Sequence, residues 1–151
     1  LRQTERLLPV PYFMVTFTVP AELRPVFLRE PKIMIDQLFQ EAAGALQEVA
    51  AMPRHLGAEL GMIGVLHTWG RQMQYHPHVH FIVPGGGLRA DGYKWRKTRK
   101  PDWLVPGEPV AARFRPESMR GSPRRAGDAS GWWICSAWVG ASRQSNTSHG
   151  M

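Results

Sequence analysis

Residues 76–83 read His-Pro-His-Val-His-Phe-Ile-Val, so polar and apolar side chains alternate along the segment. Successive side chains of a β-strand point to opposite faces of its sheet, and this alternation therefore predicts a strand. His76, His78 and His80 would share one face with Ile82. The opposite, apolar face would carry Pro77, Val79, Phe81 and Val83. A fold that buries the apolar face must leave three imidazoles together on the other one.

Two further strands and one long helix are predicted before this segment. Residues 11–19 are β-branched and aromatic and stop at Pro20, and residues 61–69 have a similar character. The polar residues 70–75 fit a hairpin connection to the histidine strand. Apolar residues recur with helical spacing from Pro31 to a predicted end before Pro53. The order strand, helix, strand, strand predicts an α+β fold, in which helices cover one face of an antiparallel sheet.

Shorter features surround these elements. Residues 21–28 are expected to form a short helical turn, and residues 84–87, Pro-Gly-Gly-Gly, to form a turn that ends the histidine strand. A second turn is expected at 91–92 and a short strand at 93–95. The composition changes near residue 116, where Gly, Pro, Ser and Arg become frequent. We therefore expect a core over 1–115 and a divergent tail over 116–151, either disordered or out of frame.

Basic residues are concentrated in one part of the chain. The 151 residues carry a net charge of +7, and residues 76–115 hold eight Lys and Arg against three Asp and Glu. A clustered excess of this kind is typical of a protein that binds a polyanion, although a solvated basic loop has the same composition. The residues expected to contact DNA phosphates are Arg89, Lys94, Arg96, Lys97, Arg99 and Lys100.

The sequence also bears on the compartment. Its apolar runs fall far short of the ~20 residues that span a bilayer, and no secretory signal opens the chain. The single cysteine, Cys135, cannot form an internal disulfide. These features predict a cytoplasmic protein that does not contact membranes. Because the sequence opens on Leu1, a fragment of a longer reading frame is expected.

A fourth histidine enlarges the predicted site. If residues 70–75 close a hairpin, His67 lies across from about His78, where cross-strand Cβ atoms are ~5 Å apart. With His80, this gives three neutral imidazoles that could bind one metal ion and leave coordination positions open, as catalytic metals require. His76 remains an alternative third ligand.

The ordered motifs resemble those of a known family. They are the segments 7–13, 16–20, 66–70, 75–88 and 91–95. The pair His78-Val79-His80 is similar to the His-U-His (HUH) motif of the rolling-circle endonuclease superfamily, where U is a bulky apolar residue. The whole set, spanning about residues 6–115, resembles the two-tyrosine transposases of rolling-circle insertion sequences.

The resemblance implies a fold and a reaction. The fold would be a Rep/relaxase-like (ferredoxin-like) HUH endonuclease core. His78 and His80, with His67 as third ligand, would bind Mg²⁺ or Mn²⁺. The substrate would be single-stranded DNA of the transposon ends, which the family nicks and joins through a phosphotyrosine during DNA transposition.

The chain departs from the family at the nucleophile. The family's two tyrosines lie four residues apart on a helix beyond the metal motif, whereas this sequence has only Tyr12, Tyr75 and Tyr93. The family's upstream cysteine-rich zinc-binding region is also missing. No catalytic residue is therefore assigned, and the sequence predicts a truncated copy that is inactive alone.

Two other functions fit the same residues. The run His76-x-His78-x-His80 also resembles the histidine triad of nucleotide hydrolases and transferases, which forms a phosphohistidine without a metal. The chain could otherwise be a non-catalytic DNA-binding remnant. Metal dependence distinguishes the first alternative from nicking, and the missing tyrosines favour the second.

Overall fold

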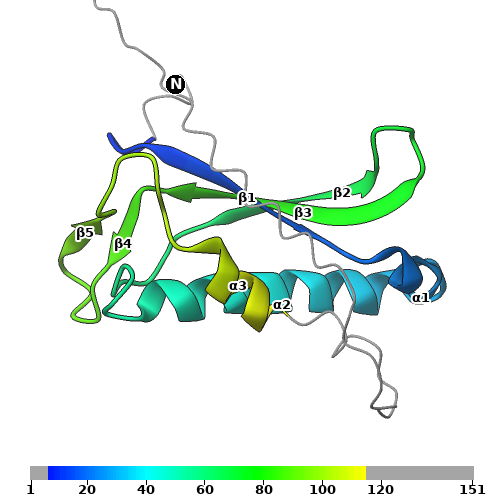
Figure 1. The fold of residues 1–151 in the computed structure, drawn as a ribbon, viewed down its shortest axis with the longest axis horizontal. Helices are drawn as coiled ribbons and strands as arrows, with labels where there is room; N and C mark the ends of the chain where they lie inside the picture. The colour runs from blue at the N-terminus through cyan, green and yellow to red at the C-terminus, as the bar shows by residue number, and fades with distance from the viewer. Residues whose placement is uncertain (1–6, 115–151) are drawn as a thin grey trace, which may run out of the picture.

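The computed structural model describes residues 7–114 of the chain. Three antiparallel strands form its main sheet: β1 (Tyr12–Thr18), β2 (Ile63–Trp69) and β3 (Tyr75–Pro84), in the order β1-β3-β2. The long helix α2 (Pro31–Ala51) and the short helix α3 (Gly107–Arg113) lie on one side of this sheet (Figure 1). The predicted α+β class, with an antiparallel sheet and helices on one face, is confirmed.

The connection from β1 to α2 is helical, as predicted for residues 21–28. A 3₁₀ turn, η2 (Ala21–Leu23), leads into α1 (Arg24–Arg29). Helix α2 then begins at Pro31, whose missing N–H is tolerated in a first helical turn, and ends two residues before Pro53. In Figure 1, α1 lies at the end of the sheet where the β2–β3 hairpin closes.

The apolar face of the sheet packs on α2. On β3, the side chains of Val79, Phe81 and Val83 are 0–3% exposed, as the alternation predicted. Edge-to-face ring contacts join the sheet to the helix layer, with centroid distances of 6.0 Å for Phe39–Phe81 and 5.0 Å for Phe17–Phe114. The helix contributes the buried residues Met34, Leu38, Ala42, Ala45, Leu46, Val49 and Ala50. Burial of this face fixes which side chains of β3 remain outside.

The prediction of a turn at residues 84–87 is wrong in part, because Gly86 and Gly87 belong to strand β4 (Gly86–Leu88). Glycine is needed there for close approach: a Cβ on Gly87 would collide with the backbone carbonyl of Glu59. That backbone pairs with Leu88 through two hydrogen bonds of 2.7 and 2.9 Å. The Gly-rich run therefore allows two chain segments to meet rather than only reversing the chain.

Strand β5 (Trp95–Lys97) pairs antiparallel with β4 and begins at the last residue of the strand predicted at 93–95. Helix α3 was not predicted from the sequence. Its seven residues include Gly107 and Pro109, and they are too few to show helical periodicity.

No helix within residues 7–114 has the length and apolar character needed to cross a membrane. The predicted tail at 116–151 lies outside the described residues.

Candidate metal centre

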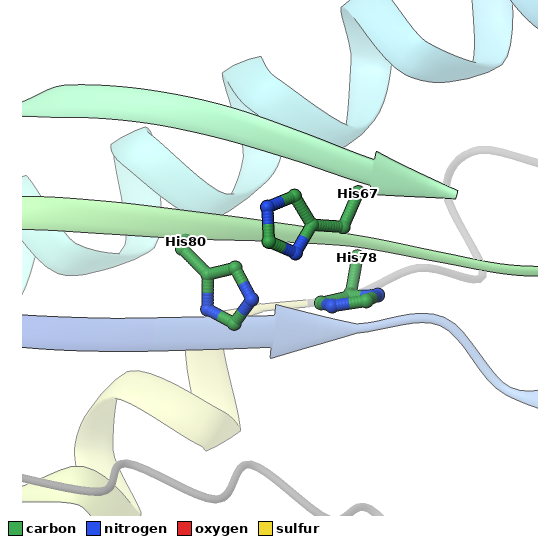
Figure 2. A group of neighbouring side chains, drawn as sticks. All are labelled: His67, His78 and His80. Atoms are coloured by element: carbon green, nitrogen blue, oxygen red, sulfur yellow. The ribbon is translucent and has the colours of Figure 1, made fainter. Parts of the chain in front are cut away.

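Three histidines meet on the face of the sheet that points away from α2. His67 on β2 is the direct cross-strand partner of His78 on β3, so the predicted hairpin register is confirmed. His80 lies two residues further along β3, on the same face. One ring nitrogen from each histidine lies within 4.8 Å of the others. Figure 2 shows the three rings converging from the two strands.

The spacing of these nitrogens is slightly wider than that of nitrogens bound to one metal ion. Two imidazole nitrogens bound ~2.1 Å from one ion can be at most ~4.2 Å apart. The three nitrogens, within 4.8 Å of one another, would have to move closer together to bind one ion. Three ligands leave further positions open, and no described helix covers this face of the sheet (Figure 1).

The rings also pack against one another. Their centroids are 4.6 Å apart for His67–His80, 4.8 Å for His78–His80 and 5.2 Å for His67–His78, all edge to face. Trp69, half-exposed at the end of β2, stacks on His67 with a centroid distance of 4.9 Å and an interplanar angle of 14°. This stacking restricts the His67 ring while leaving part of the indole open to solvent.

Hydrogen bonds orient two of the three rings. His78 Nδ1 lies 2.8 Å from the backbone carbonyl oxygen of His76, which can only accept, so Nδ1–H donates and the lone pair is left on Nε2. His80 Nδ1 lies 2.7 Å from the Thr16 hydroxyl oxygen. When Nδ1–H donates to this hydroxyl, the lone pair of His80 is also on Nε2. Such partners typically fix the tautomer and orientation of metal-binding histidines.

The surroundings of His80 favour its neutral form. Burial lowers the pKa of His80 below the ordinary value of 6.5, and the neighbouring His78 and His67 lower it further. A neutral imidazole is the form that binds a metal. The cluster therefore keeps His80 in its ligand form at neutral pH.

His76, the alternative third ligand, stands apart from the cluster. Its Nδ1 lies 2.7 Å from Nη2 of Arg24, the first residue of α1. Burial, followed by the charges of Arg24 and His78, lowers the pKa of His76. The geometry thus groups His67, rather than His76, with His78 and His80. Sequence reasoning missed Arg24, because only the fold brings α1 to the start of β3.

The basic residues predicted to bind DNA lie elsewhere. They surround β4 and β5, at the end of the sheet away from α1 (Figure 1). Arg96 donates to the Leu56 carbonyl at 3.2 Å, and Arg99 donates to the Pro53 carbonyl at 3.1 Å. Arg89 lies 4.0 Å from an Asp91 carboxylate oxygen. Lys94, Lys97 and Lys100 are exposed.

The tyrosines lie outside the histidine cluster. The Tyr12 hydroxyl accepts a hydrogen bond from the Leu8 backbone N–H at 2.9 Å. Tyr75 is half-buried at the start of β3 and packs against the core, and its burial raises the pKa of its hydroxyl. Tyr93 is 94% exposed near the β4–β5 turn.

Comparison with known proteins gives the family. The family model described as "Putative transposase" (Y2_Tnp) matches residues 61–127. The chain is 41% identical over 109 residues to "Putative transposase y4qJ" of Sinorhizobium fredii (strain NBRC 101917 / NGR234), covering 72% of the chain and 27% of that protein. It is 36% identical over 110 residues to "Transposase for insertion sequence element IS801" of Pseudomonas savastanoi pv. phaseolicola, covering 68% of the chain and 26% of that protein.

The chain thus spans about a quarter of the length of these two relatives. No solved structure matches it. The matched residues include β2, β3 and all three histidines of the cluster. The chain belongs to the Y2 family of insertion-sequence transposases.

Proposed function

We propose that the histidine cluster is the divalent-metal site of a domain that nicks and joins single-stranded DNA at transposon ends. The observation that carries this proposal is the convergence of His67, His78 and His80, whose ring nitrogens lie within 4.8 Å on an open sheet face. Membership of the transposase family supplies the DNA substrate class. Rolling-circle nicking, and the HUH assignment of this core, are parts of the same proposal.

His67, His78 and His80 would hold the ion, Mg²⁺ or Mn²⁺. Bound there, the ion would polarise the scissile phosphodiester and offset the negative charge that develops during strand cleavage. Three nitrogen donors suit Mn²⁺ better than Mg²⁺, which prefers oxygen ligands, although Mg²⁺ is the more available ion in cells.

Side chains near the cluster would orient the metal-binding histidines, and other side chains would bind the DNA strand. Thr16 and the His76 carbonyl hold the His80 and His78 rings, each by one hydrogen bond to Nδ1. Trp69 is half-exposed beside the cluster and offers an aromatic surface on which an unpaired base can stack. The exposed lysines of residues 94–100 would bind phosphates further along the strand.

We also propose that residues 1–151 alone do not complete covalent cleavage. The family's nucleophilic tyrosine pair has no counterpart in it, since no tyrosine follows Tyr93. The Tyr12 hydroxyl is hydrogen-bonded to Leu8, Tyr75 packs against the core, and Tyr93 is exposed. Residues 1–151 would thus bind metal and DNA as a non-catalytic part of the transposase reaction.

A DNA-binding experiment tests the proposal. A fluorescent single-stranded oligonucleotide is titrated with the chain in Mn²⁺ and in EDTA, with duplex DNA of the same sequence as the control. We expect tighter binding in Mn²⁺, a preference for single strands, and no cleavage product in either buffer. Binding that is identical in Mn²⁺ and EDTA would contradict the metal role. Metal-independent hydrolysis of a nucleoside phosphoramidate would instead support the histidine-triad alternative.

A further inference from the structure

Arg24 and His76 form a second polar contact beside the histidine cluster. Arg24 Nη2 lies 2.7 Å from His76 Nδ1, which joins the start of α1 to the start of β3. Both side chains are half-buried. The metal-site proposal does not use either side chain.

The chemistry of this contact determines what the pair can bind. A guanidinium carries five N–H donors and no acceptor, so His76 Nδ1 must accept the hydrogen bond. The proton of the neutral His76 ring is therefore on Nε2. Together, Arg24 and His76 offer a ligand only donors: the remaining guanidinium N–H groups and the imidazole Nε2–H. A donor-only pair is suited to an anion.

Arg24 also lacks a counter-ion. Among residues 7–114, Arg89 and Arg113 lie within 4.0 Å of a carboxylate, whereas Arg24 does not. Its Nε is buried and has no hydrogen-bond acceptor in the same part of the chain. Because this nitrogen is buried, an anion would bind the remaining Nη N–H groups of Arg24, and such a bound anion would stabilise the half-buried cation.

The position of the pair indicates which anion it would meet. The His76 and His78 ring centroids are 5.5 Å apart, so an anion held by the pair would lie beside the cluster. Resting on the proposed function, we infer that Arg24 and His76 form a phosphate subsite. It would hold a phosphodiester of the single-stranded DNA next to the metal-bound one.

A purely structural role for the pair gives a different expectation. If Arg24 only ties α1 to β3, its removal lowers the stability of the fold and leaves the electrostatics of DNA binding unchanged. A phosphate contact instead contributes to the salt dependence of binding, by a slope of about 0.7 per neutralised phosphate of a single strand.

The experiment compares Arg24→Gln with Arg29→Gln. Arg29 is an exposed residue at the other end of α1, so this control removes the same charge without touching His76. Affinity for a single-stranded oligothymidine is measured in Mn²⁺ over a series of salt concentrations. For Arg24→Gln we expect affinity about tenfold lower at low salt and a salt slope smaller by about 0.7. For Arg29→Gln we expect changes within about twofold.

Mn²⁺ titrations distinguish a failure of the proposed metal site from a failure of the phosphate subsite. Mn²⁺ is titrated into the parent and into Arg24→Gln, and both should bind it alike. A parent that does not bind Mn²⁺ would overturn the proposed function. A parent that binds Mn²⁺ and DNA, with Arg24→Gln giving the same salt slope as the parent, would overturn the phosphate subsite alone.

His76→Asn keeps the inference testable if Arg24→Gln does not fold. Asparagine offers Arg24 a carbonyl acceptor and retains the backbone carbonyl that orients His78, but its shorter side chain cannot place an N–H donor at the position of the His76 Nε2–H. We expect DNA affinity to fall about threefold to tenfold with the fold intact. Unchanged affinity in a folded His76→Asn would count against a donor role for this ring.

Discussion

The Thr16 hydroxyl oxygen lies 2.7 Å from His80 Nδ1, so strand β1 orients one ring of the cluster formed by β2 and β3. Thr16 is the direct cross-strand neighbour of His80. All three strands of the sheet thus contribute to the candidate metal centre, although only two of them carry its ligands.

Thr16→Val should weaken metal binding. Valine has nearly the same shape and suits a β-strand, but it cannot accept the Nδ1–H of His80. Removing a partner that orients a metal ligand typically lowers metal affinity by about 10- to 100-fold. Calorimetric titration with Mn²⁺ measures the change. Thr16→Ser keeps the hydroxyl and should keep the affinity, so an equal loss in both variants would contradict the orienting role.

Replacing Lys94, Lys97 and Lys100 together with Gln should weaken DNA binding without unfolding the protein. These side chains are exposed, whereas Arg96 and Arg99 hold backbone carbonyls of the segment that follows α2. If each lysine neutralises one phosphate, the salt slope for single-stranded DNA should fall by about 2. Fluorescence anisotropy at several salt concentrations measures the slope. A slope equal to the parent's would place the DNA elsewhere on the surface.

Acidification should destabilise the fold in the absence of metal. The pKa values of His76 and His80 lie below the ordinary 6.5, chiefly because burial disfavours the charged ring. As pH falls below 6.5, the unfolded chain takes up these protons before the folded chain does. The free energy of unfolding therefore decreases below that pH and has its full value above it.

Urea unfolding in EDTA at about pH 7.5 and about pH 5.5 measures this effect, since 6.5 is the usual histidine pKa. The midpoint should be lower at the acidic pH. His80→Gln removes one of the histidines whose pKa is lowered and should show a smaller decrease. A midpoint that is equal or higher at the acidic pH would contradict the direction of these shifts.

Gly87→Ala should destabilise the protein by about 1–3 kcal/mol, because the added Cβ meets a backbone carbonyl that cannot move aside easily. Gly44→Ala is the matched control. A Cβ on Gly44, an exposed residue inside α2, has no atom within 4 Å, and alanine is the better helix former by about 1 kcal/mol. The Tm of thermal unfolding should therefore decrease for Gly87→Ala and increase for Gly44→Ala.

The main sheet and its long helix were predictable because their patterns extend over several residues. Alternation along 76–83 gave the buried face of β3, and the polar segment 70–75 gave the hairpin that pairs His67 with His78. Helical spacing after Pro31 gave α2. In β3 and α2, burial of one face determines the spacing of apolar residues, so a short stretch of sequence is enough to predict the element.

The remaining features depend on contacts between distant segments. Gly86 and Gly87 look like turn residues, yet they form a strand because the Glu59 backbone approaches them. The bond from Thr16 to His80 joins residues 64 positions apart, and that from Arg24 to His76 joins residues 52 apart. No local pattern encodes these contacts, so they became visible only in the folded chain.

Calorimetric titration of the chain with Mn²⁺ tests the central claim most directly, compared with a variant carrying His78→Ala and His80→Ala. We expect the parent to bind one Mn²⁺ ion and the variant to bind none, with circular dichroism showing both folded. A folded parent that binds no Mn²⁺, or a variant that binds it as well as the parent, would contradict the assignment of His67, His78 and His80 as a metal centre.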